Sequence, residues 1–431
     1  MAVRGAMALA AALWLVVGCG DDTPVGGDAG LDAEAGVDAR VDAGPDADAG
    51  RDADLPDCDD PIRQTFDWPP EPTEYDFCDD MLFKLPVDMR KEETGSDVEL
   101  RGNDLLYTDR HIAEGEEAFA LYYFDLATCR HYRVAWQEPQ DVYKAAVWDH
   151  KVAVNWALPC ANSPTQFYVI DLGDWSYEQV TFDDNGGGAL TMAYNGRYLG
   201  WYGAFDDPPD EEHWETRVMD LQTGLYQEVA DEAAYPDYMA ASDTFLTWIE
   251  YASGSQGRRA VWYEQDEGQV HVIDQTLPYH QAFVTAWGRK VVGHRALNSM
   301  FGPYVAWVYD VDSGEYQEVA QEPILCPFPR PWKTVLAMNT TKYIPDPQDR
   351  YPRDIMLLDT ETGVERRVTS EPGYVFLPGG FDPPWLVIGV FPGVKNRHNY
   401  WVLNVYEAGL IDEDGHVVPG GPVIAPPGFD D

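Results

Sequence analysis

Short apolar runs alternate with polar turns along most of this chain, and the alternation repeats at a nearly constant interval. One recurring unit is an apolar or β-branched run, an Asp, a polar turn that often contains Gly, and a short segment ending in Val. It reads QFYVIDLGDWSYEQVT at 166–181 and AWVYDVDSGEYQEVA at 306–320. Apolar runs bounded by turn residues are typical of β-strands. Each unit therefore predicts two strands joined by a tight turn.

The polar marker of this unit sets the repeat length. Seven copies are visible, and neighbouring markers lie 45–49 residues apart. The markers are Asp125, Asp171, Asp220, Gln265, Asp310, Asp359 and Asn404. An Asp before a turn accepts hydrogen bonds from backbone N–H groups two residues on. We therefore expect these side chains to stabilise their turns rather than to bind a ligand.

A second turn precedes each marker and separates two further apolar runs. These turns are predicted at 102–104, 149–150, 195–196, 242–243, 288–289, 339–340 and 382–383. Several contain Asn or Gly, which supply the positive φ angles that hairpin turns need. Each period thus contains two hairpins, or four strands.

Four strands in each period are the signature of a β-propeller blade. Runs such as FYVIDL are apolar on successive residues, which suits sheets covered on both faces. We predict an all-β, seven-bladed β-propeller with four antiparallel strands in each blade. The fourth strand of the last blade is expected from residues 81–85, or alternatively from the tail through Leu410 or Val417.

The choice of closing strand determines which cysteines can form a disulfide. If residues 81–85 close the ring, Cys78 and Cys129 lie in third-to-fourth-strand loops of neighbouring blades and can form a disulfide. Cys58–Cys78 is the competing pair. No Cys-x-x-Cys pair occurs, which disfavours a zinc or thioredoxin-like site.

The first residues have a different character. Arg4 precedes an apolar stretch that is too short to span a bilayer and has the length and flanks of a secretory signal peptide. The sequence VVGC at 16–19 resembles a bacterial lipoprotein cleavage site. The resemblance implies that residues 1–18 are removed and that Cys19 carries the lipid, in the cell envelope, periplasmic or at the surface. The alternative is an ordinary signal peptide with a chance cysteine.

Residues 19–60 form the expected linker. Positions 21–60 hold 14 acidic and two basic residues and no aromatic one, so they cannot bury enough apolar surface to offset chain ordering. We predict a disordered Asp/Ala/Gly tether. A calcium-binding tract is the alternative, but its ligands need fixed loop positions and the Asp spacing here drifts. Residues 61–97 are a lead-in with the possible closing strand, and 98–431 the propeller.

The net charge indicates which classes of binding partner suit this protein. The chain carries −46 overall, and −35 remains for residues 61–431 once the tether and Arg4 are set aside. Such a body repels nucleic acid, whose protein partners rely on Lys and Arg. Basic protein surfaces, cationic ligands and metal ions suit it better. We expect a monomer that reaches the membrane through its lipid.

Candidate binding residues are expected near the connections between second and third strands, which share one face of a propeller. Two of these connections, 205–215 and 344–354, are long, Pro-rich and charged, as binding loops on rigid scaffolds often are. The candidates are Asp206, Asp207, Asp210, Glu211, Glu212, His213, Trp214, His111, His294, His398, Asp346, Asp349 and Arg350. Solvated surface is the alternative. The four His residues would bind a transition metal if their rings converged.

A column of rings is also expected near the ends of second strands. Its members are Tyr107, Trp156, Trp201, Trp248 and then His294. Packing between blades is the interpretation we favour, and a sugar-stacking platform is the alternative.

The repeat is similar to that of a known family. An Asp, a turn and a closing Val-Thr, as in DLGDWSYEQVT at 171–181 and DTETGVERRVT at 359–369, resemble TolB-type repeats, a branch of WD-like propellers. The resemblance covers about 98–412. The chain departs from the family in lacking Ser-Pro-Asp-Gly turns, and TolB itself has six blades and an N-terminal domain without a counterpart here. The resemblance implies a protein-binding platform.

We therefore predict an exported lipoprotein whose propeller binds a protein or an envelope polymer, without a resident cofactor. No nucleophile elbow or phosphate-binding Gly loop occurs, and we expect binding rather than catalysis. The first alternative is a polysaccharide lyase or glycosidase that uses the central pocket. The second is a purely structural surface protein.

Overall fold

The structure of the chain is a computed structural model. It describes residues 68–86, 89–90, 98–113, 116–137, 142–156, 166–181, 188–206, 212–230, 236–251, 258–273, 281–297, 303–322, 327–343, 354–370, 374–392 and 397–425. Within these ranges the chain forms strands and no helix, so no described helix could cross a membrane. The predicted signal peptide, the tether, Cys19 and Cys58 lie outside them.

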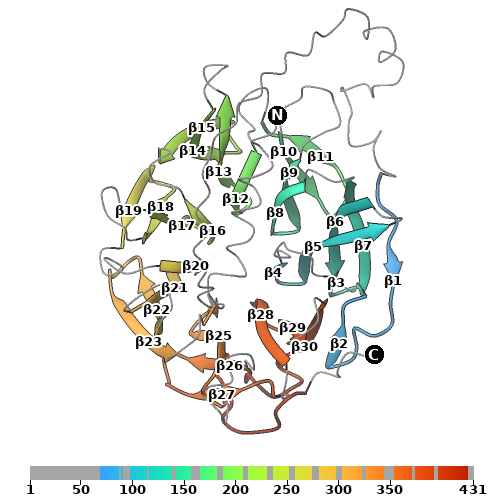
Figure 1. The fold of residues 1–431 in the computed structure, drawn as a ribbon, viewed down its shortest axis with the longest axis vertical. Helices are drawn as coiled ribbons and strands as arrows, with labels where there is room; N and C mark the ends of the chain where they lie inside the picture. The colour runs from blue at the N-terminus through green and yellow to red at the C-terminus, as the bar shows by residue number, and fades with distance from the viewer. Residues whose placement is uncertain are drawn as a thin grey trace, which may run out of the picture.

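Seven antiparallel sheets surround a common axis, which confirms the predicted seven-bladed propeller (Figure 1). From the innermost strand outward, the blades are blade 1, β4 (Val98–Arg101), β5 (Asp104–Ala113), β6 (Glu116–Asp125) and β7 (Arg130–Gln137); blade 2, β8 (Val142–Trp148), β9 (Lys151–Trp156), β10 (Gln166–Asp171) and β11 (Tyr177–Gln179); blade 3, β12 (Gly188–Tyr194), β13 (Tyr198–Asp206), β14 (Glu212–Asp220) and β15 (Leu225–Ala230); blade 4, β16 (Asp237–Ala241), β17 (Phe245–Tyr251), β18 (Arg258–Glu264) and β19 (Gln269–Val272); blade 5, β20 (Gln281–Trp287), β21 (Lys290–Ala296), β22 (Tyr304–Asp310) and β23 (Tyr316–Glu322); blade 6, β24 (Arg330–Trp332), β25 (Val335–Thr340), β26 (Asp354–Asp359) and β27 (Glu365–Arg367); and blade 7, β28 (Tyr374–Asp382), β29 (Trp385–Pro392), β30 (Arg397–Asn404) and β2 (Leu82–Lys84).

Both ends of the propeller contribute to the last blade. Strand β2 pairs antiparallel with β30, and β3 (Met89–Arg90) pairs with the beginning of the same strand. The closing strand therefore comes from the N-terminal side, the first of the two closures considered. The tail does not supply that strand, because Leu410 and Val417 are buried in the hydrophobic cluster between blades 6 and 7.

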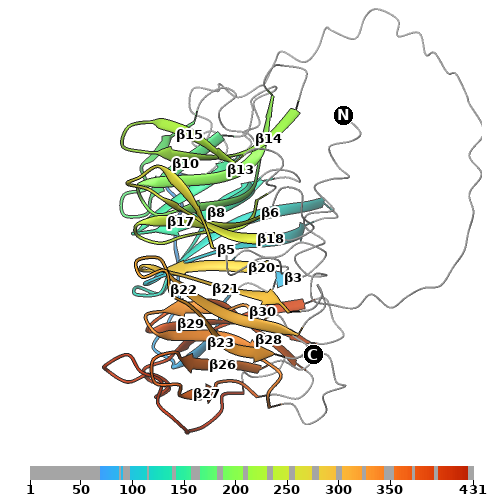
Figure 2. The ribbon, with the colours of Figure 1, turned by 90° about the vertical axis from the view of Figure 1, so that its left-hand side faces the viewer.

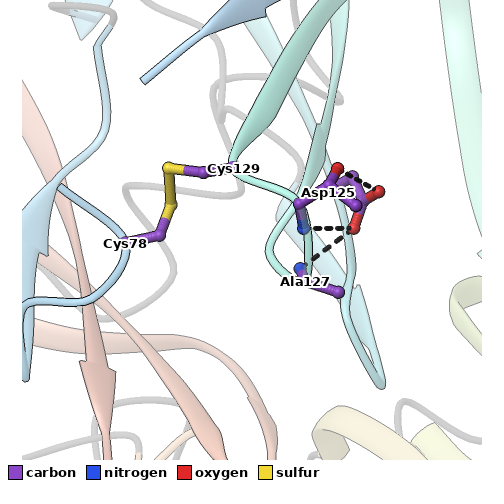
Figure 3. Close-up of a disulfide and its surroundings, with 5 residues drawn as sticks. Cys78, Asp125, Ala127 and Cys129 are labelled. Atoms are coloured by element: carbon purple, nitrogen blue, oxygen red, sulfur yellow. Dashed lines mark hydrogen bonds between the residues drawn. A yellow bond between two sulfur atoms is a disulfide. The ribbon is translucent and has the colours of Figure 1, made fainter. Parts of the chain in front are cut away.

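The N-terminal segment is also fastened to blade 1. Strand β1 (Thr73–Glu74) pairs with β7 and gives this blade a fifth, outermost strand. A disulfide joins Cys78 to Cys129 in the turn between β6 and β7, as Figure 3 shows. This is the pairing that the N-terminal closure predicts. One covalent bond thus connects the segment that closes blade 7 to blade 1.

The hydrophobic core lies between the blades. In β9, Val152 and Val154 pack with blade 1, whereas Ala153 between them packs with blade 3. A strand with a neighbouring blade on each side buries successive residues, which is why the apolar runs do not alternate. The same pattern recurs around the ring.

Six of the seven marker residues end a third strand, and their side chains accept hydrogen bonds from N–H groups of the turn that follows, as expected. In Figure 3, for example, Asp125 accepts a hydrogen bond from the backbone N–H of Ala127 at 2.9 Å. The fourth marker is one residue away from the predicted one, because β18 ends at Glu264 rather than at Gln265. The N–H of Gly268 donates to the Glu264 carbonyl, as Gly224 does to Asp220. The Glu264 carboxylate forms an ion pair with Arg289, whereas the other marker side chains accept hydrogen bonds from their turns.

One predicted hairpin turn is wrong. The first hairpin of blade 6 turns at Lys333-Thr334, not at 339–340. Lys333 adopts the left-handed φ of 51° that such a turn requires. Asn339 lies in β25 and is fully buried. Its residue type favours a turn, but burial between two blades holds it in the strand.

Candidate functional site

The two faces of the propeller carry connections of different length. Because neighbouring strands are antiparallel, the first-to-second and third-to-fourth turns lie on one face, here called the lower face. Within each blade these turns contain two to five residues, and Figure 2 shows them along its left side. The other strand ends lie on the opposite, upper face, where nine residues (157–165) separate β9 from β10 in the sequence and thirteen (341–353) separate β25 from β26. Longer connections on a rigid scaffold are where binding residues concentrate.

The predicted loop at 205–215 includes the ends of β13 and β14, which pair as a regular hairpin in blade 3. Asp206, the last residue of β13, pairs with Glu212, and His213 pairs with Phe205. Trp214 is half-buried, with its ring 5.4 Å from that of Tyr202. The remaining candidates of both loops lie outside the described residues; they are Asp207, Asp210, Glu211, Asp346, Asp349 and Arg350.

The four His candidates lie in strands rather than in loops. His111 is in β5, opposite Ala118, and His398 is in β30 of blade 7. His213 and His294 occupy blades 3 and 5. In the described part of the chain, no three metal-ligating side chains come together. A metal site on these four His residues stays an untested alternative, because the side chains of His111, His213 and His398 lie outside the described ones.

His294 is a core residue. Its ring is fully buried among Phe283, Tyr304 and Phe328, with centroids 5.1 to 5.9 Å away. Burial lowers the pKa of His294 to about 3, so the ring is neutral near pH 7. Neither ring nitrogen finds a hydrogen-bond partner among the described residues. This ring is thus enclosed between blades and does not contribute to a binding face.

Replacing His294 by Phe should make the protein less sensitive to acid. The unfolded chain takes up a proton near pH 6.5, whereas the folded chain resists it down to about pH 3. Stability therefore falls as pH drops through this window, at roughly 1.4 kcal/mol per pH unit. Urea unfolding between pH 7 and 4 should give a shallower slope for H294F by that amount. The F283L variant should lower stability equally at each pH, and an unchanged H294F slope would contradict the assignment.

Three rings of the expected column pack between blades, as favoured, whereas Trp156 ends β9 and its side chain lies outside the described ones. Tyr107, Trp201 and Trp248 are each the fourth residue of a second strand and are buried. A sugar-stacking platform needs exposed faces, which these three rings lack. The fourth residue of β21 is Gly293, not His294, and the Trp307 ring fills the space beside it.

Side chains from distant blades meet at the lower end of the axis. Arg101, the last residue of β4, donates from Nη2 to the Ala241 carbonyl in blade 4 at 2.7 Å. Its guanidinium lies 4.3 Å from the ring centroid of Trp148. Trp148 also packs with the cluster between blades 3 and 4. Because blades 1 and 4 are not neighbours, the contact between Arg101 and Ala241 spans the axis near its lower end.

The charges around Arg101 stabilise this crossing. Burial lowers the pKa of Arg101, while the carboxylates of Glu99, Asp382 and Asp243 act in the opposite direction. Burial likewise raises the pKa of Asp382, which accepts a hydrogen bond from the N–H of Gly102 at 2.7 Å. The sequence analysis missed this group. Its signal is a Trp directly before the first turn of copies two, five and six, as in Trp148.

Blades 3 to 6 each contain an ion pair with a buried carboxylate or guanidinium. The pairs are Glu215–Arg217, Glu250–Arg259, Glu318–Arg295 and Asp354–Arg367. Burial raises the pKa of Asp354, and Arg367, 2.7 Å away, opposes this effect. Each carboxylate is therefore paired with a cation of its own blade; three of the pairs join two strands, and Glu215–Arg217 lies within β14.

Comparison with known proteins supports the fold. No family model matches the chain, and no curated protein matches it. An oligogalacturonate lyase from Vibrio parahaemolyticus is 14% identical, over 80% of this chain and 100% of its own, with a TM-score of 0.51. The β-propeller domain of the Trilobed protease from Pyrococcus furiosus is 11% identical, over 73% and 93%, at 0.49. TolB from Acinetobacter baumannii is 8% identical, over 68% and 78%, at 0.35. Of these three structures, the lyase alone exceeds a TM-score of 0.5, and at 14% identity its likeness shows the fold alone.

Proposed function

We propose that this chain is an exported lipoprotein whose propeller binds a protein or an envelope polymer at its upper face. The observation that carries the proposal is the asymmetry of the two faces. The lower turns are short and the Arg101 side chain spans the lower end of the axis, whereas most pairs of successive strand ends on the upper face are separated by more residues. Binding surfaces of rigid scaffolds are built from such connections.

Two further observations support export and the kind of partner. The Cys78–Cys129 disulfide is of the kind that persists in an oxidising compartment outside the cytoplasm. The net charge of −46 favours a partner with a basic surface. The resemblance to TolB-type repeats implies a protein as that partner.

Glycan cleavage is a second candidate function, suggested by the name of the lyase that shares the fold. That likeness spans the whole of the lyase chain. Because the body of this protein is strongly acidic, the glycan would be a neutral or cationic one. Binding and cleavage predict different results in one experiment.

The experiment uses the lipid-free chain, made as C19S, as bait in an extract of the cell envelope, with and without chelator. A partner bound at the upper face should be lost when the loop acids are neutralised in D207N/D210N/E211Q. We expect an affinity roughly tenfold weaker, because three acidic charges at about 0.5 kcal/mol each total about 1.5 kcal/mol, and 1.4 kcal/mol is a factor of ten.

The control removes the same number of charges from exposed lower-face and tail positions, as D266N/E315Q/E413Q. It should bind like the parent chain. Equal loss in both variants would indicate non-specific electrostatic attraction. Turnover of added envelope glycan without a retained partner would overturn the binding proposal in favour of cleavage. If the bait neither retains a partner nor turns over glycan, the purely structural alternative is favoured.

A further inference from the structure

The last described part of the chain lies across blade 6 after leaving blade 7. We call residues 405–425 the C-terminal latch. Ile424 donates its N–H to the Val368 carbonyl at 2.7 Å, and its carbonyl accepts the N–H of Ser370. A bridge between Thr369 and Ile424 thus extends the outer edge of blade 6. The latch occupies an edge that would otherwise have unpaired backbone groups.

Apolar and polar contacts hold the latch in place. Leu410, Ile411 and Val417 are buried between blades 6 and 7. The Arg366 guanidinium donates from Nη1 to the carbonyls of Gly409 and Val418, the second at 3.1 Å. These contacts do not depend on pH near neutrality, because Arg stays protonated there.

One contact of the latch can titrate near neutral pH. His416 Nδ1 lies 2.9 Å from Asp359 Oδ2, at the end of β26. The Asp359 side chain is fully buried, whereas that of His416 is 39% exposed. Asp359 Oδ1 already accepts the N–H groups of Glu361 and Thr362. His416 therefore supplies the hydrogen bond to the remaining oxygen of a buried carboxylate.

We propose that the C-terminal latch is a pH-sensitive clasp on blade 6, tightest while His416 is protonated and looser once it loses its proton. The acidic groups around His416 fit this role. Asp412 accepts the backbone N–H of His416 at 2.8 Å, and Glu361 lies in the turn after β26. Lys333, on the turn that follows β24, lies beside Gly415, and its positive charge acts against protonation of His416.

The direction of the pH effect follows from the two partners. The hydrogen bond to Asp359 raises the pKa of His416 above its ordinary 6.5, and Asp412 and Glu361 act in the same direction. The charged contact is complete below pH 6.5 and is lost as pH rises through the raised pKa. Burial would raise the pKa of Asp359, but hydrogen bonds from His416 and the following turn lower it below 3.8 overall. The clasp is thus tightest between these limits.

Hydrogen exchange of the full chain tests the clasp, with the Ile424 amide as the reporter. After correction for intrinsic exchange, its protection should fall several-fold from pH 6 to pH 9. In H416Q, whose side chain can still donate but does not titrate, protection should be constant. The matched control is H150Q, which alters a His–Asp pair of similar length between His150 of blade 2 and Asp104 of blade 1. In H150Q, the protection of the Ile424 amide should fall between pH 6 and pH 9 as it does in the parent chain.

A second variant keeps the proposal testable if H416Q folds poorly. Glu361 is exposed and contributes to the attraction felt by His416, so E361Q should move the loss of protection to lower pH while leaving the pair intact. Constant protection in the parent chain, or the same fall in H416Q, would overturn the proposal. So would an E361Q profile identical to that of the parent.

Discussion

Replacing Arg259 by Leu should lower the free energy of unfolding by about 3–5 kcal/mol, because it leaves a buried carboxylate without its cation. Arg259 Nε donates to Glu250 Oε1 at 2.8 Å, and only 5% of the Glu250 side chain is exposed. Trp248 Nε1 donates to the other oxygen at 3.2 Å. Arg259 is thus the cation paired with Glu250 in the described part of the chain, and urea denaturation near pH 7 measures the loss.

The double variant E250L/R259L distinguishes a lost partner from a general packing defect. Replacing both members of a buried pair by apolar residues is often nearly neutral, so most of the loss should be recovered. A surface pair gives the comparison. Asp312, bonded to Arg289, has an exposed side chain, and D312N should cost no more than about 1 kcal/mol. Equal losses in R259L and the double variant would refute the explanation.

Removing the disulfide in C78A/C129A should lower stability by about 4 kcal/mol, as loop-closure entropy predicts for a bridge that spans 51 positions. The bridge closes the loop from Cys78 to Cys129, which carries β2, so the unfolded chain without the bridge gains freedom within that loop. Thermal and urea unfolding of the oxidised protein and the variant measure the difference.

The reduced parent chain is the control for the substitutions themselves. It should unfold like C78A/C129A, because both lack the covalent link and keep β2 on β30. Hydrogen exchange should show lost protection at residues 82–84 before other strands. A variant as stable as the oxidised parent would mean that the unfolded chain is already confined near Cys78 and Cys129 by other contacts.

The local sequence pattern was sufficient to predict the strands and turns, but not the exact residue at which each of them begins or ends. The Asp markers identified third strands because an Asx turn needs only the side chain and the next few N–H groups. The same rule misplaced the fourth copy, where Glu264 uses its carboxylate for Arg289. It also misplaced the first turn of blade 6, because Asn339 is held in β25 by burial that comes from other blades. His294 was assigned to the binding face for the same reason, since its burial depends on Phe328 of the next blade.

By itself, the sequence determined the repeat, the number of blades and the strand content, because hydrophobic periodicity and turn chemistry act over a few residues. It also indicated the N-terminal closure through the position of residues 81–85. Only the tertiary structure decided which polar groups face each other: Arg101 with Ala241 across the axis, Glu250 with Arg259, and His416 with Asp359. These contacts join residues that are distant in the chain or lie on separate strands. Their energies depend on burial that arises only when the blades close into a ring.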